Sequence, residues 1–366
     1  MSRKRKRIIR MLIRWIPFLL IGIVIIIVVG ILLSGGGKNK DVSKLVFPKA
    51  LGKTDVFRVG DEICGKPEMM VFLTAMQTEY EKVYGEEIWN TSLDGVTLEA
   101  YVKDKVLEKA AQIKSMYLLA KSKGIELEDQ EKSIAEAAAK DYCGQLSAEQ
   151  KEALGITEET VQALFEEYAM ANKVYLMITG DVNPEISDDE ARIVTIQHVL
   201  IRTGSKDAEG NWVEFKTAQK DAAYEKAQKV LEEAKEGKKS FEEIASHYSE
   251  DPNLTYSFGK GEMDPAIESV AFQLETNEIS NVVESSGGYH VIKCINTFDS
   301  EETQNNKEKI LEERRNEAFG QEYEAFVEGL TKKLNESTWE EVELLKGDDL
   351  PMVDFFDVYD KFFPQA

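Results

Sequence analysis

The chain has 366 residues, of which 43% are hydrophobic and 9% aromatic, enough to bury the cores of more than one domain. Its formal net charge is −22, but residues 1–40 hold nine basic residues and no acidic one, so the remainder carries 36 basic against 67 acidic residues, a net charge of −31. A domain this acidic repels the phosphates of nucleic acids, which excludes DNA or RNA binding. The negative charge favours basic or neutral polypeptide partners. An equally good explanation is that it only keeps the protein soluble.

An uncharged apolar run extends from Trp15 to Leu33. As a helix, its roughly 19 residues would span about 28 Å, close to the thickness of a hydrocarbon core. Seven of the nine basic residues precede the run, which predicts a cytoplasmic N-terminus and an extracytoplasmic bulk. The alternative is a cleaved signal peptide, but the run is long for one and Ser34–Gly37 is a weak cleavage site. We therefore expect a single-pass anchor in the cell membrane, with residues 1–40 comprising the basic segment, anchor and tether.

Residues 41–189 are predicted to form a mostly helical lobe. The spacing of Val102, Val106 and Ala110 is that of one helix face, and Ser147 with Gln150 forms a capping-box signature. An extended start with a short strand at Val56–Val59 precedes the helices. The expected helices cover Glu68–Tyr84, a segment from Thr97 to a stop at Gly124, 127–142, a short piece after Ser147, and Thr157–Met177.

Residues 190–299 change to a different pattern. From Ile193 to Arg202 apolar residues occupy both faces of a period-two repeat, which predicts a strand buried on both sides. A polar loop, a helix over 218–236, a short helix capped by Ser240, a third near 265–273 and a closing strand at Tyr289–Asn296 follow. This order predicts a compact α+β module.

Residues 300–366 are predicted to begin with a long helix, because one series of positions at three- or four-residue spacing is apolar except for Arg315. The series is Leu311, Arg315, Phe319, Tyr323, Phe326, Leu330 and Leu334. The small α+β module cannot bury so long a stripe, so we expect this helix to return to the helical lobe. The tail from Leu350 to Phe363 is rich in Asp and aromatic residues. It either mimics a client in the groove of the lobe or covers exposed core, and we prefer the second. The overall class is α+β.

All three histidines lie in the α+β module, and His198 and His290 fall in its two clear strands. Half-buried histidines on neighbouring strands can bond each other, either to hold the sheet together or to serve a site. His247 is expected on a helix surface. The three cysteines, Cys64, Cys143 and Cys294, are odd in number and have no CxxC spacing, which argues against a disulfide framework or zinc site. Cys64 with Cys143 is the one pairing to consider.

Six short motifs occur in order along this module. They are Gln197–Ile201, Phe241–Ala245 with Tyr248–Asp251, Phe258–Met263, Ala271–Leu274, Glu278–Ser280 and Gly288–Lys293. This order resembles that of the parvulins, a family of peptidyl-prolyl cis-trans isomerases, and the similarity covers about residues 190–298. The helical flanks resemble bacterial envelope foldases that insert a parvulin module into a chaperone lobe.

The resemblance implies roles for particular residues. His198 and His290 match the two histidines that frame the catalytic floor, and Asp251 matches the polar residue beside the isomerising bond. The implied substrate-binding residues are Phe258, Met263, Ile267, Phe272 and Ser285.

The chain also departs from the parvulin pattern. The glycine-rich stretch before Phe258 is shortened to Asn253–Tyr256, and Ile267 stands where the family usually has Phe, which makes the implied pocket shallower. The loop Thr203–Gln219 lacks an arginine cluster, so phosphate-directed specificity is not expected.

The resemblance implies a membrane-anchored, extracytoplasmic peptidyl-prolyl isomerase and foldase that assists the folding of exported proteins without a metal or cofactor. Its partners would be unfolded or partly folded exported polypeptides. Two alternatives stay open. The chain could be a holdase chaperone whose parvulin module is weak or inactive and only binds peptide, or an anchored scaffold for one dedicated partner.

Overall fold

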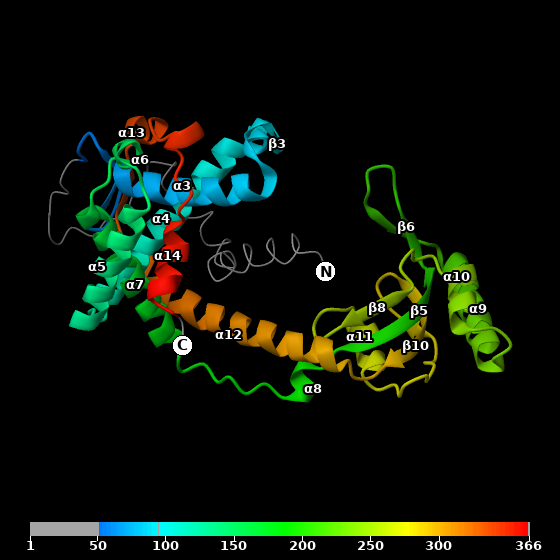
Figure 1. The fold of residues 1–366 in the computed structure, drawn as a ribbon. Coiled ribbons are helices and arrows are strands. Elements are labelled where there is room, and N and C mark those ends of the chain that lie inside the picture. Colours follow the sequence, from blue (N-terminus) through cyan, green and yellow to red (C-terminus); the bar gives the residue numbers. More distant parts are fainter. Residues whose placement is uncertain (1–50, 94, 365–366) are drawn as a thin grey trace. The chain divides into compact units, whose positions relative to one another are not determined.

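The computed structural model describes residues 51–93 and 95–364 (Figure 1). The chain is mixed α and β, mostly helical, and divides into two compact units. Unit 1 comprises Met1–Val182 and Arg315–Ala366, and unit 2 comprises Asn183–Arg314. The predicted anchor Trp15–Leu33 lies outside the described residues. Across the residues that are described, no helix is both long and apolar enough to cross a membrane.

The main helices of unit 1 begin and end close to the positions predicted from capping signals. The Thr97 hydroxyl accepts a hydrogen bond from the Ala100 amide at 3.2 Å, and Gly124 follows the helix with φ +71°. Ser147 and Gln150 form the predicted reciprocal capping box. These helices are α3 (Lys66–Tyr84), α4 (Leu98–Ser122), α5 (Asp129–Gly144), α6 (Ala148–Leu154) and α7 (Glu158–Thr179), with η1 (Glu86–Asn90), β3 (Ser92–Leu93) and β4 (Val96–Thr97) between α3 and α4.

A three-stranded sheet in unit 1 corrects one prediction. The long helix that was expected to continue to Leu334 ends earlier in the structure. This helix, α12, covers Ser300–Glu328, and Gly329 follows it. Lys332–Leu334 is strand β11, which pairs antiparallel with β1 (Asp55–Val59), whose other edge pairs with β2 (Glu62–Gly65). Glycine disfavours helix continuation, and strand pairing satisfies the backbone groups at the edge of β1.

The C-terminal tail packs on the core of unit 1. After α13 (Glu336–Glu340) and η2 (Gly347–Asp349), α14 (Phe355–Phe362) brings Phe355 to 0% exposure. Its ring stacks on that of Phe165 with 4.3 Å between centroids, and the Tyr359 ring meets Tyr168 edge-on at 4.6 Å. Phe319 and Tyr323, from the second half of α12, are buried in the same core.

Unit 2 is built on a sheet of order β8-β5-β10-β9 in which every neighbouring pair is antiparallel. Its strands are β5 (Val194–Arg202), β8 (Thr255–Phe258), β9 (Val283–Glu284) and β10 (Gly288–Asn296), and its helices are α8 (Asp188–Ala191), α9 (Thr217–Glu236), α10 (Phe241–Tyr248) and α11 (Pro265–Ala271). The predicted polar loop after β5 contains a hairpin, β6 (Gly204–Lys206) with β7 (Trp212–Glu214).

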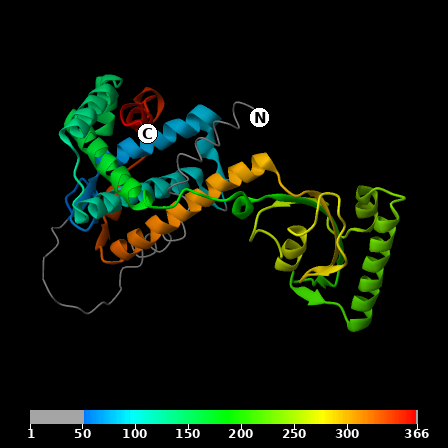
Figure 2. The same cartoon turned by 90° about the horizontal axis from the view of Figure 1, so that it is seen from below.

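Strand β5 is buried on both faces, as its apolar pattern predicts. Val199 and Ile201 pack in a core formed with α9 and α10, which lie together on one side of the sheet (Figures 1 and 2). Val194 and Ile196 pack in a second core with residues of β8 and α11. The second face also carries the even-numbered residue His198, because side chains alternate along a strand.

Replacing Phe355 with Ala is expected to lower the free energy of unfolding of unit 1 by about 3–5 kcal/mol, because it leaves a cavity within a stacked aromatic core. Urea unfolding followed by circular dichroism measures the effect. Met352→Ala, at a side chain that is 68% exposed, is the matched control and should change stability by less than about 0.5 kcal/mol. An unchanged unfolding midpoint for Phe355→Ala would contradict this packing.

Candidate functional site

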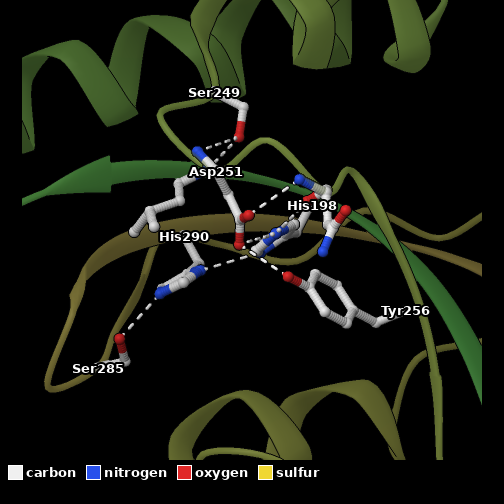
Figure 3. A network of polar contacts seen from close by, with 8 residues as sticks. His198, Ser249, Asp251, Tyr256, Ser285 and His290 are labelled. Atoms are coloured by element: carbon white, nitrogen blue, oxygen red, sulfur yellow. Dashed lines mark hydrogen bonds and ion pairs between the residues drawn. The ribbon is translucent and has the colours of Figure 1, made fainter. Parts of the chain in front are cut away.

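The two strand histidines meet on one face of the sheet in unit 2 (Figure 3). In the β5–β10 register Ile292 lies opposite His198 and Leu200 lies opposite His290, which places the histidines diagonally on one face. Their Nδ1 atoms are 3.2 Å apart and their rings are within 17° of parallel. Each histidine is only 4% exposed, so each ring must bond within the protein.

Asp251 reaches His198 from the segment that follows α10. The Ser249 hydroxyl accepts hydrogen bonds from the Leu200 and Asp251 amides, at 3.2 and 3.3 Å, and this ties the segment to β5. The Asp251 Oδ2 atom lies 3.3 Å from His198 Nε2, and Oδ1 accepts from the Asn253 amide at 2.9 Å. The structure therefore brings the three residues with implied catalytic roles together.

Tyr256 is a component of this site that the sequence analysis missed. Its hydroxyl donates to Asp251 Oδ2 at 3.0 Å, and its ring meets the His198 ring edge-on with centroids 5.2 Å apart. Burial raises the pKa of the Tyr256 phenol, and the hydrogen bond to Asp251 raises it further. A signal was present, because Tyr256 precedes Phe258 by two residues and strand alternation puts both on one face.

The hydrogen-bond partners assign the tautomers of both histidines. His198 Nε2 faces two acceptors, the Asp251 carboxylate and the Asn253 carbonyl at 3.2 Å, so it carries the hydrogen. In the neutral ring His198 Nδ1 is then an acceptor, and His290 Nδ1 must donate to it. His290 Nε2 is left as an acceptor for the Ser285 hydroxyl, 2.8 Å away. The hydrogen bonds run in one direction, from Ser285 through both rings to Asp251.

Both rings are held neutral near pH 7. Burial and, to a smaller extent, proximity to His198 lower the pKa of His290 to about 4, against the opposing effects of Asp264 and Asp251. Burial also lowers the pKa of His198, against the opposing effects of the Asn253 carbonyl and Asp251. Neutral rings are what the directional chain requires. A proton added to His198 would place two donors face to face at Nδ1, and a proton added to His290 would place a second donor at Nε2 against the Ser285 hydroxyl.

The implied apolar residues gather on the face that carries the histidines. Phe258 and Ile267 are only 3% and 5% exposed and belong to the buried part of this cluster, whereas Met263 and Phe272 are partly buried and pack against it. Arg192, which the sequence analysis also missed, covers Phe272. Its guanidinium lies 4.8 Å from the ring centroid and donates to the Phe272 carbonyl at 3.1 Å.

His247 lies on the exposed side of α10, as predicted. All three cysteines are buried free thiols. Within residues 51–93 and 95–364, no group of three or more His, Cys, Asp or Glu side chains is arranged to hold a metal ion.

Comparison with known families identifies the segment that builds this site. Residues 198–296 match the rotamase family model described as the PPIC-type PPIASE domain. The matched segment contains His198, Asp251 and His290. The chain also has homologues among the PrsA foldases, and it is 31% identical over 137 residues to "Foldase protein PrsA" of two Staphylococcus aureus strains, bovine RF122 / ET3-1 and MRSA252. That alignment covers 36% of this chain and 40% of each relative's length.

Solved structures are also similar to the chain, at low identity. The peptidylprolyl isomerase PrsA of Bacillus cereus is 20% identical, with 75% of this chain and 97% of that chain covered and a TM-score of 0.34. PrsA of Bacillus subtilis is also 20% identical, with 85% and 98% covered and a TM-score of 0.25.

Because burial lowers the pKa of His290, we expect the protein to lose stability on acidification. The unfolded chain binds a proton at His290 near its ordinary pKa of 6.5, whereas the folded state binds it only near 4, so unfolding takes up a proton in between. The free energy of unfolding should therefore fall by about 3 kcal/mol from this residue as the pH drops from about 6.5 to about 4.

Urea unfolding at several pH values tests this expectation by comparing variants. His290→Gln should flatten the acid branch of the stability curve, whereas His247→Gln, at an exposed histidine, should leave the curve unchanged. An acid branch equally steep in wild type and His290→Gln would show that His290 is not held neutral by burial.

Proposed function

We propose that this protein is a peptidyl-prolyl cis-trans isomerase and foldase that acts on exported polypeptides outside the cytoplasm. The observation that carries the proposal is the position of the Asp251 carboxylate, at the end of a neutral histidine chain and on the sheet face that also carries the apolar cluster of Met263 and Phe272. The reaction needs no nucleophile or cofactor, because only rotation about an X–Pro amide bond is required.

Amide resonance sets a barrier of about 20 kcal/mol to that rotation. In the planar amide the carbonyl oxygen carries extra negative charge, and twisting returns part of this charge to nitrogen. A fixed carboxylate near the oxygen therefore disfavours the planar form more than the twisted one. An apolar surface that holds the proline ring and removes water strengthens this electrostatic effect.

The bonds around Asp251 suit an electrostatic role better than proton transfer. The carboxylate accepts from the Tyr256 hydroxyl and the Asn253 amide and faces the hydrogen on His198 Nε2, so its orientation is fixed. Neutral histidines position the carboxylate without cancelling its charge. We assign Asp251 as the electrostatic catalyst, and His198, His290, Ser285 and Tyr256 as positioning residues.

The proposal includes the arrangement of the whole chain. Trp15–Leu33 would anchor it in the cell membrane, residues 41–189 and 300–366 would form the chaperone lobe, and residues 190–299 would form the isomerase domain. The acidic extracytoplasmic part would receive unfolded or partly folded exported polypeptides.

Asp251→Ala should lower kcat/KM for prolyl isomerisation by about 100-fold, because it removes the fixed charge beside the amide. A proline-limited refolding assay and a short prolyl peptide both measure this activity. His247→Ala is the matched control and should retain full activity. If the wild-type protein suppresses aggregation of unfolded clients but accelerates neither reaction, the holdase alternative is correct.

Tyr256→Phe keeps the ring against His198 and removes only the hydroxyl that donates to Asp251. It should lower kcat by about tenfold with little change in KM, because the freed carboxylate loses orientation while the apolar contacts stay. A change in KM alone would assign Tyr256 to substrate binding instead. Steady-state kinetics on a prolyl peptide separates the two parameters.

A further inference from the structure

An exposed aromatic surface lies in unit 1 where α3 ends and α4 begins, next to the β3 label in Figure 1. Tyr84 and Tyr101 are 49% and 42% exposed, and Val96 on the intervening hairpin is 48% exposed. Tyr80 and Trp89 are partly buried beside them. We call these five residues the aromatic patch. Exposed apolar groups gathered in this way are typical of interaction sites, whereas single ones are ordinary surface.

The rings of the aromatic patch are neighbours and are held in place. The Tyr80 centroid lies 6.2 Å from that of Tyr84 and 5.7 Å from that of Trp89. The Trp89 indole donates to Glu81 at 2.7 Å, and the same carboxylate oxygen accepts from Gln77 at 2.8 Å. Burial raises the pKa of the Tyr80 phenol, and the nearby phenols of Tyr101 and Tyr84 raise it further. The surface is therefore organised before any partner binds.

The segment that carries the patch is strongly acidic. Residues 79–108 hold eight acidic and three basic residues, a net charge of −5. Of the basic residues, Lys105 contacts Glu108 at 2.7 Å and lies over the Tyr101 ring at 5.8 Å, and Lys103 lies over the Trp339 ring at 5.1 Å. Glu86 and Glu87 are exposed in η1, between Tyr84 and Trp89. Electron-rich ring faces surrounded by carboxylates form a surface complementary to organic cations.

We propose that the aromatic patch binds extended segments of unfolded polypeptide that carry arginine or lysine side chains. The cationic heads would lie over the face of Tyr84 and, at Tyr101, take the place of the Lys105 ammonium that lies over this ring. There they would be within reach of Glu86 and Glu87, and the aliphatic stems would cover Val96. A second copy of this chain is a poor occupant, because two surfaces of the same negative sign repel each other. This inference rests on the proposed foldase function and specifies which client segments the helical unit selects.

The test measures binding of a fluorescein-labelled Gly-Ser-Arg repeat peptide to the full-length protein by fluorescence anisotropy. Matched peptides carry Gln or Glu in place of every Arg. We expect the Arg peptide to bind at least about tenfold more tightly than the Gln peptide, and the Glu peptide not to bind. Tyr84→Ser combined with Tyr101→Ser should weaken Arg-peptide binding about tenfold, and Glu86→Gln combined with Glu87→Gln about threefold.

Leu176→Ser combined with Met177→Ser is the matched control, because these side chains are 57% and 47% exposed on α7 of the same unit. That variant should bind the Arg peptide like the wild type. Equal affinity for the Arg and Gln peptides, or unchanged binding by the Tyr84 and Tyr101 variant, would overturn the proposal. So would a wild-type dimer that the same two substitutions dissociate, because the patch would then join two copies of the chain.

Isomerase activity on a short uncharged prolyl peptide keeps this inference separate from the proposed function. The Tyr84 and Tyr101 variant should keep full activity on that peptide while losing affinity for the Arg peptide. If the wild type binds the Arg peptide at the patch but has no isomerase activity, the isomerase proposal fails and the cation-binding surface stands.

Discussion

The contact between His198 Nδ1 and His290 Nδ1, 3.2 Å apart on adjacent strands, is the constraint on which the rest of the site depends. Two like nitrogens can bond only if one donates and the other accepts, so this contact requires the two neutral rings to be opposite tautomers, and the acceptors at His198 Nε2 decide which ring donates. The remaining nitrogen of each ring must then act in the opposite sense. That requirement explains why an acceptor, Asp251, stands at one end of the chain and a hydroxyl donor, Ser285, at the other.

The surrounding sheet makes this contact possible. The β5–β10 register sets the two rings diagonally on one face, and the α9 and α10 core on the opposite face buries Val199 and Ile201. Burial keeps both imidazoles neutral, which a solvent-exposed pair would not be below about pH 6.5. The same burial makes the folded state resist protonation of these rings, so the free energy of unfolding falls as the pH falls.

The core of unit 1 is built from parts of the chain that are far apart in the sequence. Phe355, near the C-terminus, stacks on Phe165, and Phe319 from α12 lies in the same core. Lys114, buried on α4, lies 2.7 Å from both Glu68 on α3 and Glu167 on α7. A buried ammonium left without its carboxylates would cost stability, which links α4 to the two helices that supply them.

Local signals in the sequence predicted much of the fold. Capping residues such as Thr97 and Ser147 mark helix starts through bonds that span only three residues, and the two-sided apolar pattern identifies β5 as a buried strand. Strand β11 was missed because its pairing with β1 joins residues far apart in sequence, while its own pattern is compatible with a helix. The β6–β7 hairpin was missed because its exposed residues carry no burial pattern.

Part of the candidate site was predicted as well, again from signals that are local in the sequence. His198, Asp251 and His290 were recognisable as side chains whose polar chemistry stands out in an apolar or motif context. Strand alternation places Tyr256 on the face of Phe258, but its contact with Asp251, like that of Arg192 with Phe272, arises from tertiary packing and was not predicted. Tyr256 lies in the segment where the chain departs from the parvulin pattern, so resemblance alone could not assign it a role.

The most direct test of this account is long-range ¹H–¹⁵N NMR of the histidine rings at pH 7, with His198→Gln and His290→Gln variants to assign the signals. The account predicts two neutral rings of opposite tautomer, with the hydrogen on Nε2 of His198 and on Nδ1 of His290. A protonated ring in this pair, or the same tautomer at both positions, would contradict the directional chain that orients Asp251.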